Sequence, residues 1–419
     1  MIVSDAMVMR YSIICPGCDA PFVVRLTLAP SKMTRFYVPC PACRLPIRAR
    51  SHGKELDSHR VEFDAEWYRG KDEPTLVVTT DPHVPSRYDA TILGQPGSGP
   101  TLTLLHLVGQ ERMHDLMRYM GGGRNAVDSW WPQVRRIYEY YLEGDWERFD
   151  KAGRAALKSK WQRVETTHER ATAAHQAVGL VLSEIVGPSE VSDRFVSRWM
   201  KKHTAALNSK DYIVFARSDA ENDLISTFQR QVFDTIDLFI ERFDSWQMGL
   251  LFRVMPGDRM LLLDEMRLFR DEFDILRDLY QQGFETTCKT LRYLVAAENT
   301  AIRGRLDDFG SSVPPLIRRK SNPRTVVAFE KLPNHDKLQY VKQVPGWEGW
   351  VSLLDNQTRN AISHASVRHD LRTGLVISDA VPSGVPYLNV AGDVYGVFEA
   401  IGLCLQVLRG IRIVSSPDF

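Results

Sequence analysis

Apolar residues recur every three or four positions in the C-terminal half of the chain. One series occupies residues 225–243 and a second residues 266–294, and Pro256, Gly257 and Asp258 separate the two. Spacing of this kind places apolar side chains on one face of a helix. A further series over residues 394–413 predicts a terminal helix. Together these segments predict antiparallel helices packed as a bundle.

Residues 103–208 also carry mostly helical patterns, and aromatic residues gather in one part of them. The apolar residues of that part are Trp130, Trp131, Ile137, Tyr138, Tyr141 and Trp146. Aromatic side chains at helical spacing usually face inward. We therefore expect them to pack in a core, with base stacking as the alternative.

Strand-like patterns are short and lie mainly near the N-terminus. Residues 22–28 and 33–38 alternate like strands, and further islands occur at 75–80 and around 90–93, in a region rich in Pro, Gly, Asp and Ser. Two short strands are also expected around residues 372–374. We predict a mainly α protein with a small β portion at the N-terminus. The predicted domains are residues 1–52, 53–102, 103–208 and 209–419.

Composition limits the classes of protein that fit. The 419-residue chain is 44% hydrophobic and 25% charged, which is typical of a soluble globular protein. Its net charge is +1, so any affinity for nucleic acid must come from local basic patches. No apolar run approaches the ~20 residues that span a bilayer, and residues 1–12 do not resemble a signal peptide. We expect a cytoplasmic protein that does not enter a membrane.

Four of the six cysteines form two close pairs, Cys15/Cys18 and Cys40/Cys43. Two residues between thiolates allow both sulfurs to reach one ion, and two such turns close a tetrahedral site. The segment between the pairs has the strand character of a zinc-ribbon hairpin. Four cysteines leave no open coordination position, so we expect a structural Zn²⁺. Two disulfides or a redox centre are the alternative.

The role of this ribbon stays open at the level of sequence. Its basic residues, with Phe36 and Tyr37, could contact nucleic acid through phosphates and stacking. It could equally be a small folding unit that docks on the rest of the protein or on a partner. The other two cysteines, Cys288 and Cys404, lie in apolar helical segments and are expected to be buried thiols.

The segment best suited to catalysis is Arg359-Asn360-Ala361-Ile362-Ser363-His364. An imidazole can move a proton to or from a hydroxyl near neutral pH, and a guanidinium can stabilise charge that builds on a phosphate. The same spacing occurs at Arg163/His168 and Arg198/His203, but only Arg359 is followed by a small polar amide. On a regular helix, residues five apart point ~140° apart. Convergence therefore needs a helix end, a long arginine reach or a second subunit.

This segment resembles the motif of the HEPN superfamily, in which an arginine with a polar follower precedes a histidine by four to six residues. The order of long helices, intervening region, motif and terminal helix resembles a HEPN-like helical bundle. The resemblance implies that His364 is the general base or acid, that Arg359 binds the scissile phosphate, and that Asn360 positions the arginine or the RNA. It also implies metal-independent cleavage of RNA by attack of the ribose 2′-hydroxyl.

The resemblance further implies a homodimer that cleaves RNA, including tRNA, in antiphage defence or as a regulated toxin. Its partner would then be a phage-derived trigger or an antitoxin. Four basic residues in the segment before the motif are expected to contact substrate phosphates, or simply to be solvated: Arg318, Arg319, Lys320 and Arg324. The alternative function is a noncatalytic zinc-ribbon and helical binding protein that acts as a sensor, regulator or scaffold.

Overall fold

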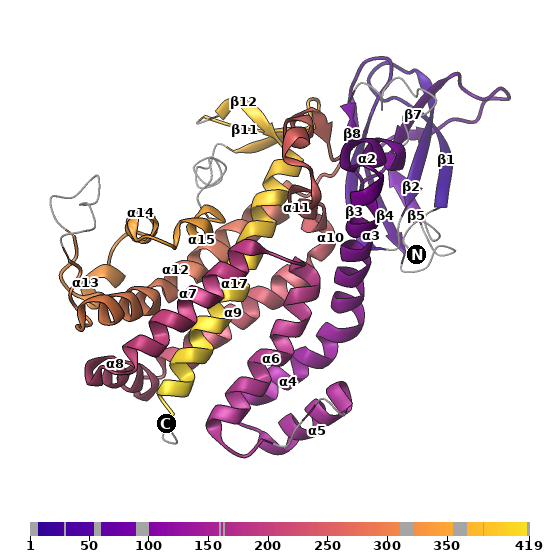
Figure 1. Cartoon of the computed structure of the whole chain (residues 1–419). Helices are drawn as coiled ribbons and strands as arrows, with labels where there is room; N and C mark the ends of the chain where they lie inside the picture. Colours follow the sequence, from indigo (N-terminus) through magenta and orange to yellow (C-terminus); the bar gives the residue numbers. More distant parts are fainter. Residues whose placement is uncertain are drawn as a thin grey trace. The chain divides into compact units, whose positions relative to one another are not determined.

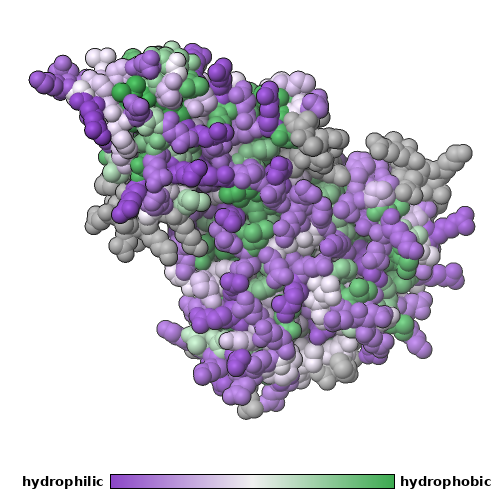
Figure 2. Space-filling model, turned by 180° about the vertical axis from the view of Figure 1, so that it is seen from behind, coloured by the Kyte–Doolittle hydropathy of each residue, from purple (hydrophilic) through white to green (hydrophobic). Residues whose placement is uncertain are grey.

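The structure is a computed structural model of the chain, and it is mostly helical with several small sheets (Figure 1). It describes residues 7–28, 31–53, 60–88, 100–158, 161, 164–310, 322–354, 367–379 and 381–416. Within these residues, no helix combines the length and apolar character needed to cross a bilayer. Hydrophilic residues cover most of the face of the protein seen in Figure 2.

The chain forms two compact units, and each collects segments that are distant in sequence. Unit 1 comprises Met1–Gly121, Arg242–Leu279 and Gln357–Tyr395. Unit 2 comprises Gly122–Glu241, Tyr280–Asn356 and Gly396–Phe419. The predicted boundaries at residues 52, 102 and 208 stay predictions.

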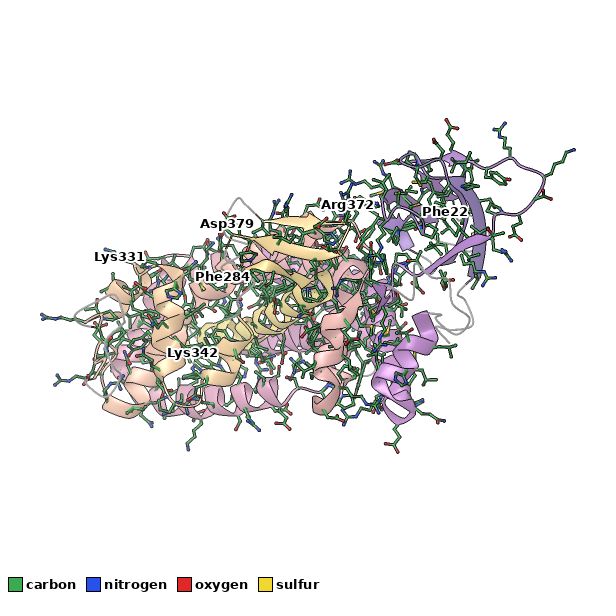
Figure 3. The ribbon with its side chains drawn as sticks, turned by 90° about the horizontal axis from the view of Figure 1, so that it is seen from above. Phe22, Phe284, Lys331, Lys342, Arg372 and Asp379 are labelled. Carbon is green, nitrogen blue, oxygen red and sulfur yellow. The ribbon has the colours of Figure 1, made fainter. Side chains whose placement is uncertain are left out.

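Unit 1 contains a β-module of two small sheets. Its strands are β1 (Met7–Ile14), β2 (Pro21–Leu28), β3 (Ser31–Pro39), β4 (Pro46–Gly53), β5 (Arg60–Phe63), β6 (Glu66–Trp67) and β7 (Leu76–Thr80). One sheet has the order β6-β1-β2-β7 and the other the order β3-β4-β5. Alternate side chains of both sheets fill one core, in which Phe22, Phe36 and Val38 are fully buried (Figure 3 shows Phe22 among the strands). The strand expected at residues 75–80 is confirmed as β7.

The expected hairpin between the two cysteine pairs is wrong. Strands do form there, as β2 and β3, but they do not pair with each other. β2 pairs antiparallel with β1 and parallel with β7, whereas β3 pairs antiparallel with β4. The physical reason is that a CxxC turn already reverses the chain at each cysteine pair. Each strand therefore pairs across its own turn, and the link between β2 and β3 connects two sheets.

The rest of unit 1 combines helices with two further small sheets. The helical segments include α2 (Pro100–Val108), α3 (Gln110–Asn125) up to Gly121, α10 (Phe243–Trp246), α11 (Leu251–Val254) and the 3-10 helix Gly257–Glu265. β8 (Ser86–Arg87) pairs with β9 (Met266–Arg267). The sheet β10-β11-β12 spans Arg368–Asp370, Leu375–Ser378 and Val381–Pro386, and β11 lies between Arg372 and Asp379 (Figure 3). The two strands expected around residues 372–374 are thus confirmed.

The second predicted helix begins later than its apolar series does. Residues 266–272 are not helical, and α12 runs from Phe273 to Arg303. Met266 and Phe269 are buried all the same, because the backbone there is extended and lies beside β3, where Tyr37 N donates to Phe269 O at 3.1 Å. Apolar spacing detects burial, and a short extended segment can place the same residues inside.

Unit 2 is a bundle of helices. They are α4 (Trp131–Glu143), α5 (Trp146–Leu157), α6 (Thr167–Val186), α7 (Glu190–Ala206), α8 (Lys210–Glu221), α9 (Leu224–Glu241), α12 from Tyr280 onward, α13 (Val326–Glu330), α14 (Asn334–Gln343), α15 (Glu348–Ser352) and α17 (Tyr387–Val414) from Gly396 onward. The apolar faces expected of α9 and α17 are buried, with Ile236, Phe239 and Ile401 fully inaccessible.

The aromatic segment of unit 2 packs inward, as expected, except at two positions. Trp131, Tyr138 and Tyr141 are buried, but Trp130 is 41% exposed and Trp146 is 37% exposed. Tyr138 and Tyr141 surround the imidazole of a buried histidine, His175 of α6. Base stacking is therefore not available to the buried members of this segment.

Candidate metal centre

Each cysteine pair forms the turn of one β-hairpin. Cys15 and Cys18 follow β1 and precede β2, and Cys40 and Cys43 follow β3 and precede β4. The two turns share the sequence pattern Cys-Pro-X-Cys-X-X-Pro, at Cys15 to Pro21 and again at Cys40 to Pro46. A repeated sequence thus produces the same local structure twice.

Backbone hydrogen bonds fix the two turns in the same way. Cys15 O accepts from Asp19 N at 3.0 Å, and Cys40 O accepts from Arg44 N at 2.9 Å. Asp19 and Arg44 occupy equivalent positions and both adopt the left-handed region, with φ of 56° and 61°. A non-glycine residue rarely does so without compensation. The turn geometry is therefore imposed by the surrounding hairpin and not by local preference.

The four sulfurs meet at one point. All lie within 4.8 Å of one another, with 3.6 Å between Cys15 Sγ and Cys43 Sγ and 3.8 Å between Cys18 Sγ and Cys40 Sγ. A tetrahedral ion with bonds of ~2.3 Å to sulfur separates its ligands by ~3.8 Å. A disulfide would need ~2.05 Å, and all four thiols are free. The arrangement fits a four-thiolate metal site better than two disulfides.

The environment of the sulfurs is half protein and half solvent. Cys15 and Cys40 are buried, whereas Cys18 and Cys43 are exposed. Burial raises the pKa of the Cys40 thiol to about 12, although hydrogen bonds from the N–H groups of Cys43 and Ala42 lower it. A metal ion would replace the thiol protons and make these N–H groups partners of a thiolate.

The β-module is held within unit 1 by an extended segment that follows β9. Asp271 N donates to Arg35 O at 3.0 Å, and Arg35 N donates to the carboxylate of Glu272 at 2.9 Å. Arg48 Nε forms an ion pair with Asp271 at 2.8 Å. Two of the basic residues available for nucleic acid, Arg35 and Arg48, are thus engaged inside the unit. These contacts favour the docking role over nucleic-acid binding for this edge of the module.

A buried polar network continues from this segment. The guanidinium of Arg270, 1% exposed, donates to Glu272 at 2.9 Å and to Pro82 O at 2.7 Å. It also lies 2.8 Å from His83 Nδ1, which must accept because a guanidinium only donates. Burial raises the pKa of Asp81 to about 7, although His83 N–H and Arg270 lower it. This network connects the end of β7 to the segment that holds β3.

The predicted catalytic residues Arg359, Asn360 and His364 lie outside the residues that the structure describes, as do Arg318, Arg319 and Lys320. Arg324 is described, and it is exposed just before α13. On one side of the motif, Tyr280 OH donates to Leu354 O at 3.0 Å. Both predicted sites stay predictions.

The histidine that follows the motif, His369 on β10, does not face solvent. Its ring lies 5.2 Å from the ring of Tyr387 and 6.0 Å from that of Tyr37, centroid to centroid. Both ring nitrogens are enclosed and form no hydrogen bond with a described residue. Burial lowers the pKa of His369 to about 4, although Asp370 raises it. At neutral pH this imidazole is neutral and packed against aromatic rings, which is unsuited to proton transfer with RNA.

Cys288 and Cys404 are buried, as expected, and burial raises the pKa of Cys404 to about 12. The sequence analysis missed the repeated Cys-Pro-X-Cys-X-X-Pro pattern, which would have indicated two equivalent hairpin turns. Comparison of the chain with protein-family models, curated proteins and solved structures gives no match.

Proposed function

We propose that this chain is a metal-independent endoribonuclease of the HEPN type. The observation that carries the proposal is the segment from Arg359 to His364, with its arginine, polar follower and histidine. Its place in the chain supports the proposal, because it follows α12 and α15 and precedes the long terminal helix α17. This is the order expected of a HEPN-like bundle.

The chemistry needs only the residues of this motif. His364 would take the proton of the ribose 2′-hydroxyl as its oxygen forms a bond to phosphorus. The bond from phosphorus to the 5′-oxygen breaks, that oxygen gains a proton, and a cyclic phosphate remains. Arg359 would bind the phosphate and stabilise its added charge, and Asn360 would orient the arginine or the RNA. The basic run that ends at Arg324 would hold neighbouring phosphates.

The four cysteines would bind Zn²⁺ in a structural role. Two facing CxxC turns and the sulfur spacing are those of a four-thiolate zinc site. The ion would have no open position for substrate or water, so it would stabilise the β-module and take no part in cleavage. A homodimer in which two motifs share a cleft would complete the picture, with defence against phage or regulated toxicity as the setting.

Cleavage of total RNA and tRNA by the purified full-length protein in EDTA tests the proposal. His364→Ala and Arg359→Ala are compared with the wild type, and His168→Ala serves as a matched control because His168 belongs to another pair with the same spacing. Circular dichroism and zinc content are measured for every sample, so that misfolding and zinc loss are detected. We expect wild type and His168→Ala to leave cyclic-phosphate ends, and both motif variants to lose cleavage.

Equal cleavage by all four proteins would contradict the proposal, because it would indicate another site or a contaminant. If none cleaves, the same variants are tested in infected cells. Protection or toxicity that survives loss of His364 would then favour the noncatalytic binding protein. Loss of that effect in both motif variants, with normal folding, would support a ribonuclease that awaits its trigger.

A further inference from the structure

The helices α4 and α5 of unit 2 pack side by side and enclose a surface cavity of about 330 Å³ (Figure 1). The chain reverses between them at Gly144, whose φ of 74° is left-handed, and Asp145 then caps α5 by accepting from Arg148 N at 3.1 Å. This volume lies at the lower end of the range for small-molecule sites. The hairpin thus presents a formed cavity on the surface of the helical unit.

Positive charge lines this cavity from both walls. Arg136 comes from α4, and Arg148 and Lys151 come from α5. All three side chains are exposed, and no carboxylate is among the lining residues. Arg148 is paired with Asp145 at 3.4 Å, and Lys151 has no ion pair with a described residue. An anion in the cavity would therefore meet cations from two directions.

The remaining surface of the cavity is apolar and flat. Ala152 and Ala155 are small and leave the space open, while the ring of Tyr140 forms part of the other wall. Tyr140 is half-buried, which fixes its ring, and the Arg148 guanidinium carbon lies 6.0 Å from the ring centroid. An aromatic face beside guanidinium groups is suited to stack a nucleobase. Inorganic anions would use only the charged part of this surface.

We propose that the α4–α5 cavity binds a nucleotide, with its phosphate between Arg136 and Lys151 and its base against Tyr140. Arginine binds phosphate through two parallel hydrogen bonds, and lysine adds a point charge. The nucleotide is either free or one unit of an RNA strand, because both offer the same phosphate and base. The site is independent of the ribonuclease motif and does not require that the chain cleaves RNA.

Binding by the full-length protein tests this site. Calorimetry measures ATP, AMP and inorganic tripolyphosphate, and fluorescence anisotropy measures a labelled 2′-O-methyl RNA strand. That strand cannot be cleaved by 2′-hydroxyl attack, so the result does not depend on the proposed activity. The variants are Arg136→Gln with Lys151→Gln, which removes two cations, and Ala155→Leu, which fills the cavity without changing charge. Arg154→Gln with Arg217→Gln removes the same charge from exposed positions outside the lining.

We expect the first two variants to weaken binding by roughly tenfold or more, and the control pair to leave it within about twofold. Tighter binding of the strand than of ATP or AMP, with a salt dependence that falls by ~0.7 per lost phosphate contact, would identify RNA as the source. Tighter binding of ATP or AMP would identify a free nucleotide. Absence of binding, equal loss in the control pair, or equal affinity for tripolyphosphate and ATP would overturn the proposal.

Discussion

Acid should destabilise the helical unit through His175, a histidine that is buried as a neutral ring. Its Nδ1 lies 2.7 Å from Ala171 O and therefore carries the proton that it donates. Its Nε2 lies 3.2 Å from Tyr138 OH and 3.3 Å from Gln229 Nε2, and accepts from them. Burial lowers the pKa of His175 from 6.5 to about 4, helped by Arg409 and Arg412, although the bond with Ala171 raises it. Protonation would turn Nε2 into a donor facing two groups that now donate to it.

The size of the effect follows from the two pKa values. The unfolded chain binds the proton near pH 6.5 and the folded chain only near pH 4. The stabilising contribution of the neutral ring is therefore complete above pH 6.5 and is lost as the pH falls toward 4. One unit of pKa corresponds to 1.36 kcal/mol, so His175 should remove about 2 kcal/mol from the free energy of unfolding between pH 7.5 and pH 5.0.

The assay is urea denaturation of wild type and His175→Gln at pH 7.5 and pH 5.0. Glutamine keeps a donor and an acceptor but does not titrate. We expect the acid-induced loss of stability to be smaller by about 2 kcal/mol in the variant. His168→Gln is the matched control, because His168 is exposed at the start of the same helix. The reasoning is refuted if His175→Gln loses as much stability in acid as wild type does.

Three further predictions address other parts of the molecule. Cys40→Ser should lower the bound zinc from about one ion per chain and destabilise the β-module, measured by metal analysis and thermal melting; unchanged zinc content and melting would contradict the four-thiolate site. Glu298→Gln should cost about 3 kcal/mol in urea denaturation, because the carboxylate, 5% exposed, accepts from Arg198 at 2.7 Å and lies 3.2 Å from Lys202. Gly283→Ala should lower the melting temperature, since a Cβ there would lie 2.4 Å from Val397 Cγ1; an unchanged value would indicate that the helices separate freely.

Parts of the fold could be predicted because a single local pattern determines them. The helices α9 and α17 each bury one face, and apolar spacing records that directly. The four cysteines follow from ligand spacing alone. The turn between β10 and β11 was recognisable because Gly374 adopts a left-handed φ of 67°, which favours glycine.

Other parts depend on contacts that no local pattern encodes. The pairing of β2 with β1 and β7 depends on where each CxxC turn sends the chain. Residues 266–272 carry a helical apolar period but are extended, because β3 offers hydrogen bonds to that segment. The cations of the α4–α5 cavity come from two helices, and each helix alone has an ordinary charged face. The motif at Arg359 lies outside the described residues, so its geometry stays a prediction.

The placement of one cysteine pair in each sheet has a consequence for how the β-module responds to its surroundings. An ion bound to all four sulfurs would join two sheets that share a core but no ladder of hydrogen bonds. Such an ion binds the folded state and not the unfolded chain, so the stability of the module follows mass action. At an ion concentration one hundred times the dissociation constant, binding adds about 2.7 kcal/mol. The zinc supply of the cell would then set what fraction of the chains is folded in this unit.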